Sequence, residues 1–108
     1  MNEPRKIYAG FAVGQVIHHK LFDYRGVIVD VDSEFQGTEE WYEQMALSRP
    51  PKNKPWYRVL VHDTKGATYV AETNLEPDPS GEPVRHPYIP VYFSEFRDGT
   101  YINPRLGN

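Results

Sequence analysis

The chain has 108 residues, of which 39% are hydrophobic and 25% are charged. This length suffices for one modest hydrophobic core and is too short for two, so we expect a single domain over residues 1–108. Ten prolines and eight glycines disfavour long helices, and the absence of cysteine excludes disulfides and thiolate metal sites. The net charge of −3 argues against nonspecific attachment to nucleic acid, because phosphate binding usually leaves a basic footprint.

The N-terminal segment lacks the apolar stretch of a signal peptide, and no window approaches the roughly 18 consecutive apolar residues of a membrane span. We therefore expect a protein that neither is secreted nor crosses a membrane. Together with the missing cysteines, this favours a cytoplasmic location.

Two strands are expected first, within residues 11–32. The residues divide into two alternating sets, as the period of two in a strand requires: Val16, His18, Lys20 and Phe22 against Ile17, His19 and Leu21, and then Val27, Val29 and Val31 against Ile28, Asp30 and Asp32. Gly14 and Gly26 stand where the first strand begins and where the chain bends into the second. A glycine, an alternating strand, an aromatic turn and a second glycine before a Val/Ile run are typical of the start of an SH3-like barrel.

The alternation stops after Asp32, and residues 33–55 are expected to form a long insertion between strands. Thr38 is a plausible N-cap for a short helix with two glutamates in its first turn. Such a short helix would be stable only if Trp41 and Met45 docked on the barrel. Three prolines then require an extended connection. Because binding residues gather on loops held by a rigid scaffold, this insertion is the leading region for specificity.

A second pair of strands is predicted over residues 56–62 and 67–72, joined by a turn at residues 64–66. Asn74 and Leu75 would form a short turn that closes the barrel. Residues 77–85 contain three prolines and a glycine and read as a linker.

The C-terminal tail, residues 86–103, is rich in aromatic side chains. Pro90 fits the first turn of a short helix, and Asp98-Gly99 predicts a turn. So much apolar surface should pack on the barrel or on a second copy of the chain. We thus predict a mainly β fold: a small SH3-like barrel of about five strands over residues 7–76, a helical insertion, and a packed C-terminal tail.

No residue pattern predicts catalysis or a metal site. His18 and His19 are adjacent on a strand and point to opposite faces, so they cannot chelate one ion together. Asp30 and Asp32 share a face, yet no nucleophile or convergent polar cluster accompanies them. No sequence motif for a hydrolase, a phosphate-binding loop or a zinc protease is present. We therefore expect a binding protein without enzymatic activity or cofactors.

The charges are segregated along the chain. Residues 33–48 carry four acidic and no basic side chains, whereas residues 49–66 carry five basic side chains against Asp63 alone, a net charge of +4. Basic and aromatic side chains are interleaved here, a mixture that can neutralise phosphates and stack on bases. A run of solvated lysines and arginines in a loop would produce the same pattern.

Nine residues are candidate contacts with DNA or another partner. The turn between the first two strands should expose its aromatic and basic residues, and one of the two aromatics that start the third strand should point outward. The insertion's tryptophan either holds the insertion down or anchors a partner. The basic candidates are Arg25, Arg49, Lys52, Lys54 and Arg58, and the aromatic candidates are Tyr24, Trp41, Trp56 and Tyr57.

Four sequence blocks resemble one family. They are VGQVIHHKLFDYRGVIVDVD at residues 13–32, EWY at 40–42, KPWYRVLV at 54–61 and YVAETNL at 69–75. In this order and spacing they are similar to the HspQ proteins, which carry the YccV-like or hemimethylated-DNA-binding domain. His86-Pro87, Tyr92-Phe93 and Asp98-Gly99-Thr100-Tyr101 are similar to a tail of its longer members, so the resemblance covers residues 7–103.

The resemblance implies two kinds of function. One is binding of hemimethylated DNA, and the other is stress-related modulation of ATP-dependent proteolysis, as an adaptor for a Lon-type protease or its substrates. The acidic composition, and the absence of an element long enough to read a major groove, suit protein partners better. An incompletely closed barrel would also leave a strand edge that a partner strand or a second copy could extend, so a homo-oligomer is conceivable.

Overall fold

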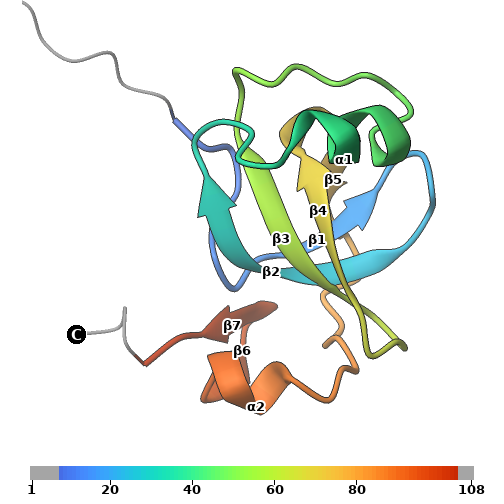
Figure 1. Ribbon diagram of the computed structural model, residues 1–108. Helices are drawn as coiled ribbons and strands as arrows, with labels where there is room; N and C mark the ends of the chain where they lie inside the picture. Colours follow the sequence, from blue (N-terminus) through green and yellow to red (C-terminus); the bar gives the residue numbers. More distant parts are fainter. Residues whose placement is uncertain (1–7, 105–108) are drawn as a thin grey trace, which may run out of the picture.

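The computed structural model describes residues 8–104 of the chain (Figure 1). Five antiparallel strands form one sheet in the order β4-β3-β2-β1-β5. The strands are β1 (Val16–His19), β2 (Arg25–Asp32), β3 (Trp56–Val61), β4 (Ala67–Ala71) and β5 (Leu75–Pro77). β2 is the longest and curves through the sheet, with a register shift between Ile28 and Asp30. The prediction of a mainly β fold is confirmed.

The sheet bends around an apolar interior. Ile17, Ile28, Tyr57, Val59 and Val70 meet inside it and are at most 5% exposed. A single 3-10 turn, η1 (Glu72–Asn74), leads from β4 to β5. Within residues 8–104 no ladder joins these two strands, so both are sheet edges. The sequence predicted a turn where β5 lies, because three residues are too few for an alternating pattern.

The insertion carries helix α1 (Glu39–Met45), which begins where the sequence predicted. The Trp41 amide donates to Thr38 Oγ1 at 3.1 Å, the N-cap hydrogen bond. Trp41 packs against the sheet as predicted, but the prediction for Met45 is wrong, because Met45 is 60% exposed and the buried residues of the helix region are Tyr42 and Ala46. Tyr42 also donates its hydroxyl to the Pro50 carbonyl at 2.8 Å, which ties the helix to the proline segment after it.

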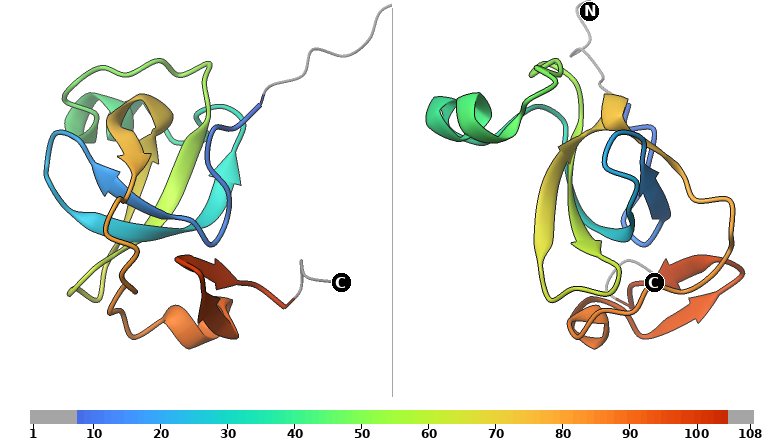
Figure 2. Two further views of the ribbon diagram at one scale, coloured as in Figure 1. Left: turned by 180° about the vertical axis from the view of Figure 1, so that it is seen from behind. Right: turned by 90° about the vertical axis from the view of Figure 1, so that its right-hand side faces the viewer.

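The C-terminal tail packs on the barrel of its own chain. It comprises α2 (Ile89–Tyr92) and a hairpin of β6 (Glu95–Arg97) and β7 (Thr100–Ile102), and it covers one end of the barrel while α1 lies on the outer side of β3 and β4 (Figure 2). Phe93 and Tyr101 join Val16, Val27 and Leu60 in a second apolar cluster. No helix within residues 8–104 has the length and apolar character needed to span a membrane.

Gly14 is the point where the hairpin meets the barrel. The Tyr101 amide donates to the Gly14 carbonyl at 2.9 Å, and the Gly14 amide donates to the Ile28 carbonyl at 2.8 Å. Gly14 has a φ of +93°, and a Cβ atom there would overlap the Tyr101 carbonyl oxygen. Gly81 also has a positive φ, +71°, but a Cβ atom would meet nothing within 4 Å.

These two glycines make a matched pair for a stability test. Gly81→Ala should cost only the strain of a left-handed backbone, about 1 kcal/mol of unfolding free energy. Gly14→Ala adds a backbone overlap and should cost roughly 1–3 kcal/mol more. Chemical denaturation of both variants measures this difference. Equal losses of unfolding free energy would show that the backbone contact between Gly14 and Tyr101 is not tightly packed.

Candidate binding surface at the insertion

Trp56 lies at the centre of an aromatic cluster on the outer face of β3. Its ring centre is 4.8 Å from that of Phe35 and 5.2 Å from that of Tyr69, and its Nε1 donates to the Pro51 carbonyl at 3.0 Å. Trp41 is half-buried beside Tyr69, with ring centres 5.7 Å apart. Trp56 itself is only 1% exposed. The insertion therefore covers this residue instead of leaving it available to a partner.

Tyr57 points the other way, into the barrel, and is fully buried. Its hydroxyl donates to Glu72 and accepts from the Phe11 amide at 3.1 Å. Burial and the hydrogen bond to Glu72 raise the pKa of this phenol well above its ordinary value. The prediction that Trp56 or Tyr57 stays exposed is therefore wrong, because α1 packs on the outward residue.

Arg49 and Lys52 are already engaged with α1. The Arg49 guanidinium donates to the carbonyls of Tyr42, Glu43 and Ala46 at 3.2–3.3 Å and pairs with the Glu43 carboxylate at 3.2 Å. The Lys52 ammonium pairs with Glu39 and lies 4.3 Å from the centre of the Tyr42 ring. Two cations of the basic segment are thus paired with two carboxylates of the acidic segment.

Arg58 and Lys54 are the two basic candidates that remain without an ion pair in the described part of the chain. Both are exposed, and neither makes an ion pair with a carboxylate of the described residues. The Arg58 guanidinium carbon is 5.7 Å from the centre of the Tyr69 ring, a cation–π contact that leaves its N–H donors free for a partner. Of the five basic candidates, these two best fit an intermolecular role.

Arg25 and Tyr24 are half-buried, so the expectation that their turn exposes them is wrong. Arg25 Nε donates to Asp78 Oδ2 at 3.1 Å, and its Nη2 donates to the Glu82 carbonyl at 2.6 Å, so it fastens the linker. The Tyr24 hydroxyl lies 2.9 Å from Thr68 Oγ1 in β4. Burial raises the pKa of Tyr24.

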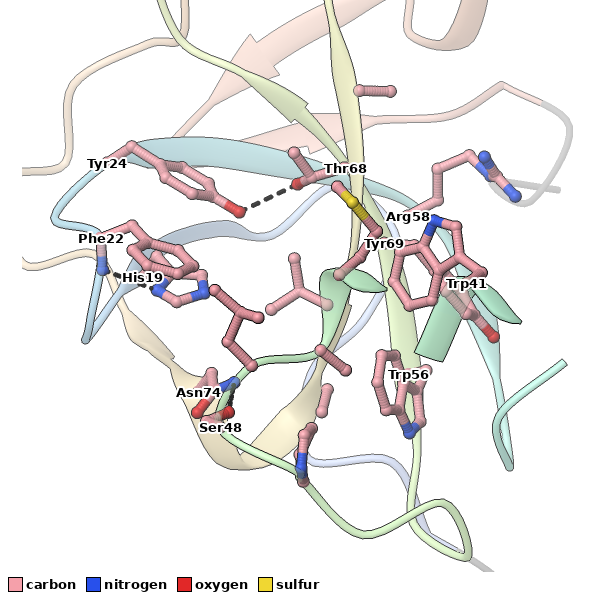
Figure 3. Close-up of a pocket in the computed structure, with 17 residues that line it drawn as sticks. His19, Phe22, Tyr24, Trp41, Ser48, Trp56, Arg58, Thr68, Tyr69 and Asn74 are labelled. Atoms are coloured by element: carbon pink, nitrogen blue, oxygen red, sulfur yellow. Dashed lines mark hydrogen bonds between the residues drawn. The ribbon is translucent and has the colours of Figure 1, made fainter. Parts of the chain in front are cut away.

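A groove of about 320 Å³ runs beside β4 (Figure 3). The loop between β1 and β2 forms one wall with Phe22 and Tyr24, and the other wall carries Trp41 and the residues at the end of α1. Three large apolar side chains of this groove are exposed: Phe22 by 64%, Met45 by 60% and Leu47 by 71%. Sequence reasoning missed the groove because its walls come from segments far apart in the chain.

A neighbouring hollow of about 320 Å³ shares Trp41, Arg58 and Tyr69 with this groove. It is also lined by Asp32, which accepts the Tyr69 hydroxyl at 2.6 Å. Burial and this hydrogen bond raise the pKa of Tyr69 to about 12. Arg58 therefore lies between two hollows, next to an aromatic surface made by Trp41 and Tyr69.

Two adjacent histidines set the shape of the β1–β2 loop. His19 is buried and its Nδ1 accepts the amides of Leu21 and Phe22 at 3.1 and 3.0 Å, while burial lowers its pKa. His18 is half-buried, with Nε2 2.6 Å from Asp23 Oδ1 and Nδ1 2.6 Å from Glu76 Oε2. These hydrogen bonds, the one to Asp23 first, raise the pKa of His18. Among residues 8–104, no cluster of His, Asp and Glu could hold a metal ion.

Comparison with protein families gives one match over most of the chain. The family model described as "Hemimethylated DNA-binding protein YccV like" matches residues 9–100. The matched range includes the whole five-stranded sheet, the insertion, and the tail as far as the first residue of β7.

The His18 contacts predict a pH-dependent stability. Because its pKa is raised, the stabilisation is fully present below the unfolded value of 6.5 and is lost as the pH rises through the folded value. The contribution of His19 to stability has the opposite pH dependence, since its lowered pKa favours the folded state above pH 6.5. The loss of melting temperature in His18→Gln should therefore be larger near pH 6 than near pH 9. A loss that does not change with pH would exclude the charged Asp23–His18–Glu76 arrangement.

Proposed function

Because the chain belongs to the YccV-like family, we propose that it is a non-catalytic cytoplasmic protein that binds hemimethylated DNA. The observation that carries the proposal is the family match over residues 9–100, whose description names this ligand. The fold supplies a surface with which DNA contact is compatible. Arg58 and Lys54 have no carboxylate partner among the described residues, and Trp41 lies at the hollow that Arg58 lines.

The proposed contacts divide into two kinds. Arg58 and Lys54 would bind phosphates and set the position of the duplex, without reading its sequence. Trp41 would offer an apolar surface to a base or to its methyl group, because apolar contact is a direct way to recognise a methyl group. Arg49 and Lys52 are not included, since both would first have to leave Glu43 and Glu39.

This division predicts a shallow salt dependence. Two phosphate contacts reduce the affinity by about twelvefold between roughly 50 and 200 mM salt, whereas five contacts would reduce it by about 500-fold. Fluorescence anisotropy with a hemimethylated duplex, beside unmethylated and fully methylated duplexes, measures both the slope and the preference. Equal affinity for the three duplexes would contradict the proposal.

Charge reversal tests the two named cations. The double variant Lys54→Glu/Arg58→Glu should bind the hemimethylated duplex at least about tenfold more weakly at low salt, since both phosphate contacts become repulsive. Lys65→Glu is the control, because Lys65 is also exposed but lies in the β3–β4 turn. If Lys65→Glu weakens binding as much as a single reversal at Lys54, the effect reports net charge and no specific surface exists there.

A second candidate is a protein-interaction module that modulates ATP-dependent proteolysis by a Lon-type protease, with a role in stress. The observation that favours it is the grouping of Phe22, Met45 and Leu47 around one groove, since a cluster of exposed apolar side chains is typical of protein-binding sites. Most arginines of the described chain are meanwhile engaged in ion pairs.

Protease assays separate the two candidates. If this protein modulates proteolysis through the groove, it should change the rate at which a purified Lon-type protease degrades casein. Leu47→Ser should abolish that change, and Lys54→Glu should leave it in place. No change of rate with the wild-type protein would exclude the second candidate for this protease and substrate.

A further inference from the structure

We propose that the groove beside β4 binds an extended apolar segment of a partner protein, which places a carboxylate next to Arg58. The inference deepens the second candidate function, because it names the site and the chemistry of the partner. It does not depend on DNA binding. Three features support it: an unpaired strand edge, apolar walls on both sides of that edge, and one charged side chain in the lining.

The hydrogen-bond pattern between β4 and β3 shows which backbone groups of β4 point toward the free edge of the sheet. The Val61 amide donates to the Gly66 carbonyl at 3.2 Å and the Glu72 amide donates to the Pro55 carbonyl at 3.0 Å, one just before and one just after β4. In an antiparallel ladder the bonded pairs alternate, so Ala67, Tyr69 and Ala71 turn their N–H and C=O groups away from β3. β4 is an edge of the sheet, and no strand of the described chain pairs with these groups.

The same edge lacks the usual protection against pairing. The sequence of β4, ATYVA, contains no charge and no proline, and the register pairs all five of its residues with β3 without a shift. Such an edge is a template for another extended chain. All five residues of β4 line the groove, both those whose side chains face the barrel interior and those whose side chains face outward. A groove that contacts both sets of residues must run along the edge of the strand.

The walls suit apolar side chains. Phe22 projects from the β1–β2 loop, and Met45 and Leu47 project from the end of α1 and the turn after it, so the exposed apolar area flanks β4 on both sides. The Tyr24–Thr68 hydrogen bond attaches the loop to the inner face of β4, and it leaves the outer side of the edge to the groove. An extended segment would present alternate side chains to these walls while its backbone bonds to the edge.

The charge of the lining selects the partner. Among the described residues that line the groove, Arg58 alone carries a charge, because His19 accepts two amide hydrogens on Nδ1 and is neutral. Its guanidinium lies at the Trp41 side of the groove (Figure 3). An apolar segment with one carboxylate matches this arrangement. A nucleic acid backbone would set several phosphates against Phe22, Met45 and Leu47, so the groove does not suit DNA.

Two synthetic peptides test the proposal with the full-length protein. Each has about ten residues, so that it spans the five residues of β4 with room to shift, and alternates Val and Thr with one Glu at the N-terminal or the C-terminal end. Because the strand direction is not fixed, one of the two should bind by fluorescence anisotropy, at least about tenfold more tightly than the same peptide with Gln in place of Glu. In the variant Arg58→Glu the preference should reverse, so that the same peptide with Lys in place of Glu binds more tightly than the Glu peptide.

Ala67→Pro removes one edge-facing N–H without breaking a bond to β3, and it should weaken peptide binding by about tenfold. Ala67→Thr keeps the N–H and separates the loss of the donor from the change of side chain. Leu47→Ser should also weaken binding, whereas Val91→Ser should not, although Val91 is equally exposed, 69% against 71%. Thermal melting shows whether each variant remains folded.

Several outcomes would overturn the proposal. One is the absence of binding by either peptide at about 1 mM, and another is an unchanged affinity in folded Ala67→Pro. A dimer that dissociates in Ala67→Pro would make a second copy the occupant. Weaker binding of the hemimethylated duplex by Ala67→Pro and Leu47→Ser would make the groove a DNA site. If the protein binds the peptide but does not bind DNA, the first candidate function is excluded and the peptide-binding proposal is not affected.

Discussion

The burial of Trp56 organises the side of the molecule on which the candidate sites lie. A helix of seven residues is marginal in isolation, so α1 depends on packing. Tyr42 and Ala46 supply that packing against Trp56 and Ala71, and Phe35 and Tyr69 surround the same indole. Once the helix is docked, its last residue, Met45, and Leu47 in the turn after it must lie beside β4. The groove is thus a consequence of how the sheet covers its largest outward-facing side chain.

The two long segments outside the barrel divide its surface between them. The insertion covers the outer face of β3 and β4, while the C-terminal hairpin covers one end of the barrel through Phe93 and Tyr101 (Figure 2). The close contact at Gly14 fixes the hairpin, because only a residue without Cβ admits the Tyr101 carbonyl there. Within residues 8–104, neither segment adds a strand to the free edge of β4. The unpaired edge of β4 therefore lies between the β1–β2 loop and the residues at the end of α1.

Local pattern predicted most of the fold and little of the site. Period-two alternation indicated four of the five barrel strands, and Thr38 indicated the start of α1, because both signals act within a few residues. Alternation placed Trp56 on the outer face of β3 but could not say what covers that face. In the same way, segment charges identified Arg49 and Lys52 without revealing that Glu43 and Glu39 would pair with them. The groove has no local signal, because Phe22 and Leu47 meet only through the tertiary fold.

The ion pairs of α1 also constrain how an acidic member of this family can contact DNA. Arg49 donates to three carbonyls at the C-terminal end of the helix, and Lys52 holds Glu39 in its first turn. A phosphate could recruit either cation only by releasing these contacts, which would loosen the helix that buries Trp56. Extensive phosphate binding and an intact insertion therefore compete with each other. In the proposed DNA-binding role, discrimination of a methyl group would then come from apolar contact, and the half-buried aromatic side chains beside Arg58, which is unpaired among the described residues, are Trp41 and Tyr69.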